Sequence, residues 1–288
     1  MAILQTLGVT SYLGGSVRSC GHTAEMLRDE FVRQKSGQKR LELMWNMLYP
    51  ENDGSKEEKL AKLNKSISLF TQHWTEENLP FVLIGGDHSC AMGTWGGVLN
   101  GLKQPGKFGL IWLDAHMDAH TYATTPSGNI HGMPLAALLG KADKKLSAMY
   151  PSANFIKPQN LILIGARNYE IEEYDLLKQA EVEIVFASQF SGFVQVLVKA
   201  IDKLSLCCET IGISIDLDCI DPEDAPGVET PAQGGIKARE LIEALSLINQ
   251  HPKVCGLEIS EFNPKTDSKH KTLHLMKEII EAFYGEPQ

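Results

Sequence analysis

The chain has 288 residues, 43% of them hydrophobic and 22% charged, and this ordinary globular composition excludes collagen-like and disordered proteins. Its net charge of -9 argues against a nucleic-acid binder, because no excess of basic residues is present to neutralise phosphates. No run approaches the ~18 apolar residues that span a bilayer, and the start lacks the features of a signal peptide. Six cysteines without metal-binding spacing predict reduced thiols packed in the core of a cytoplasmic protein.

Short apolar runs, typical of buried strands, alternate along the chain with longer amphipathic stretches, typical of helices. The predicted strands are Ile3–Leu7, Phe81–Ile84, Phe108–Leu113, Leu161–Ile164, Val182–Phe186, Ile211–Ile215 and Val254–Ile259. The predicted helices are Glu57–Trp74, Tyr174–Ala180, Phe193–Leu204, Ala238–Asn249 and Leu273–Tyr284.

Three stretches interrupt this alternation. Gln34–Lys39 is a polar breaker, Leu41–Leu48 fits either a strand or a helix, and Pro50–Ser55 has the composition of a loop. None of them marks a domain boundary. The alternation over the whole length predicts a single α/β domain over residues 1–288, doubly wound in three layers. We expect a mostly parallel sheet of about eight strands with helices on both faces.

Polar clusters follow three of the predicted strands. They are Gly85–Ser89 (GGDHS), Asp114–Asp118 (DAHMD) and Ser214–Pro222 (SIDLDCIDP). Ligands of open parallel sheets gather at the carboxyl ends of strands, which is where all three clusters fall. Taken singly, each has an ordinary explanation: a glycine-rich turn, a hydrogen-bonded strand end, or an aspartate that caps a turn. Their joint occurrence favours a shared site.

The residue types in these clusters indicate metal binding. Asp114, His116 and Asp118 alternate, so on an extended backbone their side chains point the same way, and Asp216 and Asp218 repeat the arrangement. Burying adjacent carboxylates is costly without a cation, because the charges repel and lose their hydration. Four aspartates offset the formal charge of two divalent ions, and oxygen ligands mixed with imidazole suit Mn²⁺, Fe²⁺ or Co²⁺.

With these three motifs the sequence resembles the ureohydrolases and, among them, the arginases. The likeness continues through Ser127–Pro134 (SGNIHGMP) and Gly256–Pro264 (GLEISEFNP), so it covers roughly residues 81–264. The first 75 residues match the family pattern less well. The resemblance implies hydrolysis of L-arginine to L-ornithine and urea, by attack of a metal-bridging hydroxide on the guanidinium carbon.

The resemblance also implies two Mn²⁺ ions per subunit, with Co²⁺ or another divalent ion as a substitute. One ion would be bound by His88, Asp114, Asp118 and Asp216. The other would be bound by Asp114, His116, Asp216 and Asp218, with Asp114 and Asp216 bridging.

Three residues match the family's catalytic positions. His131 corresponds to the histidine that shuttles protons, a task suited to an imidazole. Glu261 matches the carboxylate that pairs with the substrate guanidinium, and Asp118 is expected to relay a proton to the leaving nitrogen. The structural alternatives are a histidine packed in a glycine-rich loop and a solvated glutamate at a strand end.

The choice of substrate is expected to depend on the end of the molecule opposite the guanidinium, which in arginine carries the α-carboxylate and the α-amino group. The matched positions for the α-carboxylate are His120, Thr125 and Ser127, although His120 departs from the asparagine common in the family. The matched positions for the α-amino group and the guanidinium are Glu170, Glu173 and Thr230. The structural alternatives are an exposed helix-start carboxylate for each glutamate and a residue of a structural turn for Thr230.

Three functions are therefore weighed: an arginase, a sister ureohydrolase acting on agmatine, guanidinobutyrate or guanidinopropionate, and a non-catalytic metal-binding descendant. Agmatine has no α-carboxylate for Thr125 and Ser127 to hold, which favours the arginase. The complete set of expected ligands disfavours the non-catalytic protein. The family likeness implies a small guanidino substrate and a homo-oligomer, a trimer or a hexamer, with no nucleic-acid or membrane partner.

Overall fold

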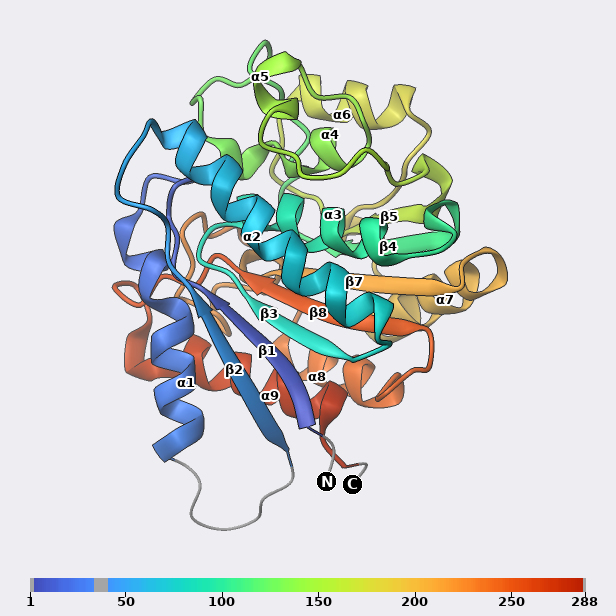
Figure 1. The fold of residues 1–288 in the computed structure, drawn as a ribbon. Helices are drawn as coiled ribbons and strands as arrows, with labels where there is room; N and C mark the ends of the chain where they lie inside the picture. The colour runs from blue at the N-terminus through green and yellow to red at the C-terminus, as the bar shows by residue number, and fades with distance from the viewer. Residues whose placement is uncertain (1–2, 34–40, 287–288) are drawn as a thin grey trace.

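The computed structural model describes residues 3–33 and 41–286 and has an eight-stranded sheet at its centre (Figure 1). All paired strands are parallel, and their order is β2-β1-β3-β8-β7-β4-β5-β6. The strands are β1 (Ile3–Val9), β2 (Glu42–Leu48), β3 (Phe81–Ile84), β4 (Phe108–Leu113), β5 (Leu161–Ile164), β6 (Glu183–Val185), β7 (Thr210–Asp216) and β8 (Val254–Ser260). The predicted α/β fold with about eight strands is confirmed.

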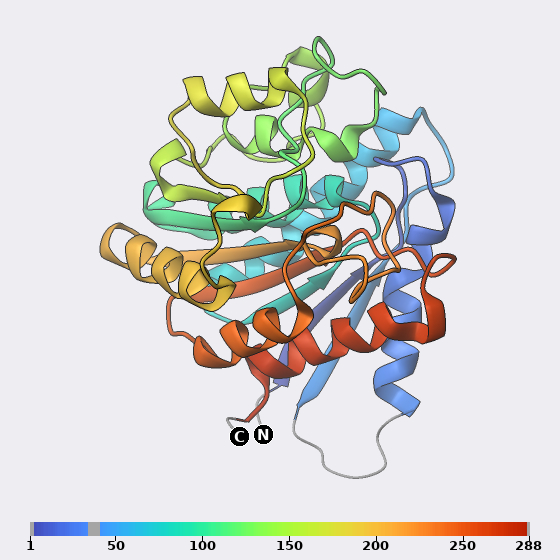
Figure 2. The same cartoon turned by 180° about the vertical axis from the view of Figure 1, so that it is seen from behind.

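Helices cover both faces of the sheet, as Figures 1 and 2 show from opposite sides. Helices α2, α3, α4 and α6 share a core with one face, and α1, α7, α8 and α9 share a core with the other. The helices are α1 (Thr23–Arg33), α2 (Lys56–Glu76), α3 (Ala91–Gly101), α4 (Pro134–Leu138), α5 (Lys144–Ser147), α6 (Ile171–Gln179), α7 (Phe193–Cys207), α8 (Ala238–Leu247) and α9 (Lys271–Tyr284).

The central strands are apolar at every position because they contribute to two cores. In β3, Phe81 and Leu83 belong to the core under α2 and α3, while Val82 and Ile84 belong to the core under α7, α8 and α9. Successive side chains of a strand point to opposite faces, so a strand covered on both sides needs apolar residues throughout. These uninterrupted runs are what made the central strands predictable.

Several elements differ from the prediction. The stretch Leu41–Leu48, left open between strand and helix, forms the edge strand β2, whereas Gln34–Lys39 lies outside the described residues. The prediction omits α1, α3 and the short helices α4 and α5. Four of the six free cysteines are buried as expected, but Cys207 is exposed at the end of α7, so the prediction is wrong there. Among the described helices, none combines the length and the apolar character that crossing a bilayer requires.

Helix α3 was missed because it contains four glycines, which have low helix propensity. Tertiary packing explains them, because α3 lies directly against α2. A Cβ atom at Gly97 would stand 2.1 Å from Thr71 Oγ1 and 2.4 Å from the carbonyl oxygen of Ser68. The close approach of the two helices therefore requires a residue without a side chain.

We expect the Gly97→Ala substitution to lower the free energy of unfolding by about 1–3 kcal/mol through overpacking. In an open helix the same substitution stabilises by about 1 kcal/mol, so the sign of the effect is diagnostic. Urea denaturation measures it. The control is Gly132→Ala, where an added Cβ meets no atom within 4 Å. A Gly97→Ala protein at least as stable as the wild type would contradict the packing argument.

Candidate metal centre

The strand order brings the three polar clusters to one place. Strands β3, β8, β7 and β4 are consecutive neighbours at the middle of the sheet. His88 lies in a 3₁₀ turn shortly after β3, Asp114 directly follows β4, Asp216 is the last residue of β7, and Glu261 directly follows β8. Because all the strands are parallel, these carboxyl ends meet along the same edge of the sheet.

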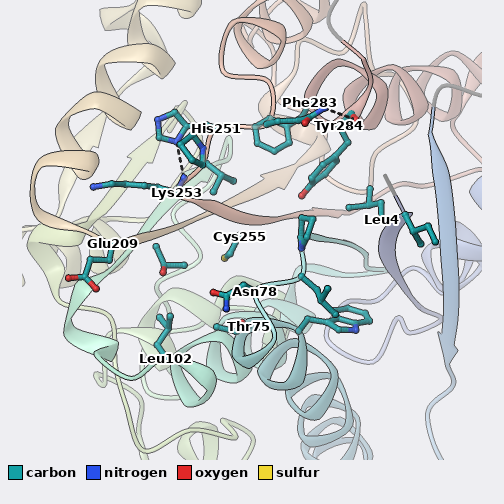
Figure 3. A pocket seen from close by; sticks show the side chains of 18 of the residues that line it. Leu4, Thr75, Asn78, Leu102, Glu209, His251, Lys253, Cys255, Phe283 and Tyr284 are labelled. Atoms are coloured by element: carbon teal, nitrogen blue, oxygen red, sulfur yellow. Dashed lines mark hydrogen bonds between the residues drawn. The ribbon is translucent and has the colours of Figure 1, made fainter. Parts of the chain in front are cut away.

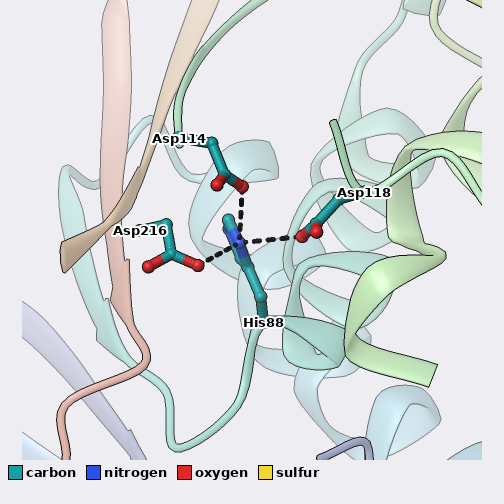
Figure 4. Close-up of side chains that lie close together, drawn as sticks. All are labelled: His88, Asp114, Asp118 and Asp216. Carbon is teal, nitrogen blue, oxygen red and sulfur yellow. Dashed lines mark ion pairs between the residues drawn. The ribbon is translucent and has the colours of Figure 1, made fainter. Parts of the chain in front are cut away.

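The first group of predicted ligands surrounds the imidazole of His88 (Figure 4). Its Nδ1 atom lies 3.4 Å from Oδ2 of Asp114, 3.2 Å from Oδ2 of Asp118 and 3.2 Å from Oδ2 of Asp216. All four side chains are buried. Ligand atoms about 2.1 Å from one cation, at right angles, stand about 3 Å apart, so these distances suit a shared ion.

The hydrogen bonds of His88 support the same interpretation. Ser214 Oγ donates to Glu258 Oε2 at 3.1 Å, so it is left to accept from His88 Nε2, 2.9 Å away. The proton of the ring is then on Nε2, and the lone pair of Nδ1 faces three carboxylates. Among the described residues, neither His88 Nδ1 nor Asp118 Oδ2 has a hydrogen-bond partner. A divalent cation between them would satisfy both atoms, so the residues fit the implied metal.

A second group, formed by Asp114, His116 and Asp218, adjoins the first. His116 Nδ1 lies 3.1 Å from Oδ2 of Asp218 and 3.6 Å from Oδ1 of Asp114. Asp114 thus presents one oxygen to each group, as a bridging ligand would. Asp216 joins only the first group, and its Oδ1 accepts a hydrogen bond from the backbone N–H of Asp218 at 2.9 Å. Asp216 thus contacts Asp218 of the second group, and its share in binding the second ion stays a prediction.

The local backbone differs from the extended alternation that the motifs suggested. Strand β4 ends at Leu113, and Asp118 adopts a positive φ of 47°, which is uncommon for a residue other than glycine. Asp218 likewise lies beyond β7, in a 3₁₀ turn that the side chain of Asp216 caps. Tight turns after the strands therefore bring the ligands together, and the pleat of a strand does not.

The electrostatics show how strongly this site favours a cation. Burial, followed by the nearby charge of Asp114, raises the pKa of Asp118 to about 6. Burial opposes a charge on the ring of His88, yet the three facing carboxylates raise its pKa well above the usual value. In the absence of a metal, the histidine thus holds a proton where a divalent ion would neutralise more of the negative charge.

Two residues that the sequence analysis overlooked hold the ligands in position. Trp112 Nε1 donates to Oδ2 of Asp114 at 2.8 Å, and its ring stacks on that of His88 with centroids 4.1 Å apart. Glu258, buried in β8, anchors Ser214 behind His88. A single charged residue inside the apolar run Val254–Ser260 was the available signal for Glu258. Partners of this kind fix ligand orientation at metal sites.

The two predicted catalytic residues outside the metal groups contact each other. His131 Nδ1 lies 3.1 Å from Oε1 of Glu261, and the same oxygen accepts the backbone N–H of His88 at 2.6 Å. Glu261 is only 1% exposed, which excludes the solvated glutamate considered above. Burial raises the pKa of Glu261 to about 7, although His131 opposes this. The charge of Glu261 raises the pKa of His131 to about 10 despite its burial.

Thr230 and the two glutamates of the predicted substrate region have local structural partners. Thr230 Oγ1 donates to Oδ2 of Asp218 at 3.0 Å, which supports a ligand of the second group. Glu173 accepts the backbone N–H groups of Glu170 and Ala119, both at 3.1 Å, and so caps the start of α6. Burial raises its pKa to about 8. Glu173 therefore stands at the start of α6, but it is buried there and not an exposed carboxylate.

His120, Thr125 and Ser127 lie in the segment between β4 and α4, after Asp118. His120 Nε2 is 3.2 Å from Oε2 of Glu170, and its Nδ1 is 3.1 Å from the hydroxyl of Thr124. The hydroxyls of Thr125 and Ser127 are 3.5 Å apart and each accepts a backbone N–H. Their O–H groups remain able to donate to an anion.

A cavity of about 390 Å³ lies at the opposite edge of the sheet (Figure 3). Its lining includes Leu4, Thr210 and Val254, which stand at the amino ends of β1, β7 and β8. Of the described residues that line it, none belongs to the predicted site. The chemistry of this chain is therefore assigned to the carboxyl ends of the strands, where the acidic groups and histidines gather.

Fold and site together define a metalloenzyme of the ureohydrolase class, and comparisons with known proteins narrow this further. The sequence pattern of the Arginase family matches residues 19–285, and the chain belongs to that family. It is 40% identical to the arginase of Bacillus subtilis (strain 168) over 232 residues, which cover 80% of this chain and 74% of that protein.

Two further similarities extend over nearly the whole chain. The arginase of Brevibacillus brevis is 33% identical over 273 residues, 94% of this chain and 90% of its own length. A crystal structure of Bacillus subtilis arginase has a TM-score of 0.88 at 30% identity and covers 99% of both chains. The resemblance and the fold stated from the sequence are therefore confirmed.

We expect the Ser214→Ala substitution to weaken Mn²⁺ binding by about 10–100-fold, because it removes the acceptor that orients His88. Isothermal titration calorimetry measures the affinity. The control is Ser246→Ala, whose hydroxyl donates to the carbonyl of Ile242 on the exposed side of α8. Unchanged Mn²⁺ affinity in the Ser214→Ala protein would show that this contact does not support the site.

Proposed function

We propose that this chain is an arginase that hydrolyses the guanidinium group of L-arginine, producing L-ornithine and urea. The observation that carries the proposal is the pair of adjoining metal-ligand groups that share Asp114, with Glu261 and His131 beside them. Membership of the arginase family supports it. The same observation disfavours a non-catalytic descendant, because the groups that the chemistry needs are assembled.

The proposed cofactor is two Mn²⁺ ions per chain, one on each ligand group, with Co²⁺ as a functional substitute. The donors are carboxylate oxygens and imidazole nitrogens, a set that suits such ions better than a purely thiolate-binding metal. Bound there, two divalent cations would supply a water of lowered pKa as the nucleophile. Asp114 would hold the two ions at a fixed spacing because its two oxygens face different groups.

Glu261 is proposed to orient the substrate. Its carboxylate is buried and anchored by the backbone of His88, so it is fixed beside the metal ligands. A planar guanidinium donates parallel hydrogen bonds to such a carboxylate, which aligns its carbon with the site. Removal of water from the buried carboxylate strengthens its attraction for a cationic substrate.

Asp118 and His131 are proposed to move protons. Asp118 is a buried carboxylate of the first ligand group, and it is proposed to relay a proton to the leaving nitrogen. His131 is bonded to Glu261 on one side, and its side chain is 17% exposed. It thus connects the buried site with solvent.

The α-group contacts are proposed for Thr125, Ser127 and Glu170. The two hydroxyls donate to the α-carboxylate, and the exposed carboxylate of Glu170 accepts from the α-ammonium group. His120 is proposed to position Glu170, which it contacts directly. Thr230 is proposed to act through Asp218, and Glu173 through the start of α6.

Three broader statements from the sequence are carried forward as proposals. Residues 1–288 are proposed to act as one domain, because one sheet and the two cores on its faces connect the described elements. The protein is proposed to form a homo-oligomer, a trimer or a hexamer. Its six free cysteines support the proposed cytoplasmic location.

The substrate is tested with a panel of arginine, agmatine, guanidinobutyrate and guanidinopropionate, assayed for urea with Mn²⁺. We expect arginine to have the highest kcat/KM. The Thr125→Val and Ser127→Ala substitutions should each raise the KM for arginine by roughly 10–100-fold, the cost of one hydrogen bond to a charged group. The control is Ser147→Ala on α5. A preference for agmatine that neither substitution alters would favour the sister ureohydrolase.

The metal assignment is tested by removing the metal ions from the protein and then adding them back. Chelation should abolish activity, and Mn²⁺ or Co²⁺ should restore it. We expect the His116→Ala protein to bind one Mn²⁺ fewer per chain and to lose nearly all turnover, since the second group loses its only imidazole. Atomic absorption counts the metal, and His274→Ala, at an exposed histidine of α9, is the control. Restoration by Zn²⁺ alone, or full activity in the His116→Ala protein, would refute the assignment.

A further inference from the structure

A third group of ligand-type side chains lies beside the proposed binuclear centre. It is formed by Cys20, Glu229 and Glu261, each with one ligand atom within 4.8 Å of the others. Cys20 Sγ is 3.6 Å from Oε2 of Glu229. Cys20 lies in the 3₁₀ turn before α1, Glu229 in the segment between β7 and α8, and Glu261 after β8, so the tertiary fold alone brings them together.

The remaining contacts of the two glutamates leave one oxygen of each available. Oε1 of Glu261 is held by His88 and His131, whereas its Oε2 is buried and has no hydrogen-bond partner among the described residues. Oε1 of Glu229 accepts from the backbone N–H and the hydroxyl of Ser16, at 3.2 and 3.1 Å. An unpartnered buried carboxylate oxygen is costly, and a cation would satisfy it.

We propose that Cys20, Glu229 and Glu261 form a third cation site, selective for ions such as Zn²⁺ and Cd²⁺ that bind thiolate and carboxylate together. A tetrahedral ion with bonds of about 2.3 Å to sulfur and about 2.0 Å to oxygen separates the two atoms by about 3.5 Å. The observed separation of Cys20 Sγ from Glu229 Oε2 is 3.6 Å. The thiolate distinguishes this site from the two oxygen and imidazole groups, which suit Mn²⁺.

Binding at this site has a defined proton balance. Cys20 is fully buried, and its pKa is raised first by burial and then by the charges of Glu261 and Glu229, so the free site holds a neutral thiol. When the sulfur–metal bond forms, the thiol proton leaves to water. Glu229 is half-buried, which gives the ion a route from solvent and leaves a position for water.

The consequence for catalysis rests on the proposed function. Glu261 is the carboxylate proposed to orient the substrate guanidinium, and a cation on its Oε2 would occupy it. An ion at the third site therefore inhibits arginine hydrolysis without displacing either Mn²⁺ ion. The site acts as an inhibitory sensor for thiol-binding metals.

The test is a Cd²⁺ titration of the Mn²⁺-loaded protein, monitored by the ultraviolet thiolate-to-cadmium charge-transfer band. The His and Asp groups contain no sulfur, so the band reports cysteine ligation only. Because Cys207 is exposed and its Sγ is 3.7 Å from that of Cys208, the reference protein carries Cys207→Ser. We expect the reference to develop the band with one equivalent of Cd²⁺, and the Cys20→Ser protein in the same background to lack it.

A second variant, Glu229→Gln, keeps the proposal testable if the Cys20→Ser protein does not fold. Glu229→Gln keeps Cys20 but removes a charged ligand, and we expect it to weaken Cd²⁺ binding by about tenfold or more. Thermal melting of each variant verifies that it is folded. A reference protein without the band, an equal band after Cys20→Ser, or unchanged Cd²⁺ affinity after Glu229→Gln would overturn the proposal.

The inhibitory effect is measured in the same proteins. One equivalent of Cd²⁺ should abolish most urea release by the reference, whereas the Cys20→Ser protein should keep its basal rate and resist the ion. Equal inhibition of both proteins would overturn the regulatory role, since Cd²⁺ would then act at the binuclear centre. If the Mn²⁺-loaded protein released no urea from any guanidino compound, the proposed function would fail, while the band would still decide the cation site.

Discussion

The mutual repulsion of buried carboxylates at the ends of β4 and β7 is the constraint on which the rest of the site depends. Asp114, Asp118, Asp216 and Asp218 are all buried within two adjoining groups, and each loses hydration while facing another negative charge. Histidines placed among them offset part of this cost, and divalent cations would offset more. The unusual backbone at Asp118 is tolerated because the surrounding packed sheet and turns determine it.

In this fold, the residues that stabilise the protein are different from the residues that form the metal groups. Strands buried on both faces supply two apolar cores, which hold the carboxyl ends of β3, β4, β7 and β8 in fixed positions. Trp112, Ser214 and Glu258 then extend the rigid scaffold to the ligands, so that His88 and Asp114 have single orientations. The cavity at the amino ends contains none of the predicted metal or catalytic residues among the described residues that line it.

Glu261 connects the parts of the site. One of its oxygens contacts both the backbone of His88 and the ring of His131, and its other oxygen is free of hydrogen bonds among the described residues. A change at this carboxylate therefore affects substrate orientation, proton exchange and the environment of a metal ligand at once. The neighbouring Cys20 and Glu229 place a metal-binding group on the same carboxylate, which is how the proposed third site would influence catalysis.

The sequence by itself determined the parallel α/β fold, the family, and the residue types of the metal groups, because apolar runs and short motifs are local properties. Tertiary structure decided which of those residues meet. The left-handed turn at Asp118 and the capping role of Glu173 depend on backbone angles and contacts that residue spacing does not encode. The glycines of α3 were likewise explained only by the helix against which they pack. Strand order brings together residues more than a hundred positions apart, and that order results from the packing of the whole chain.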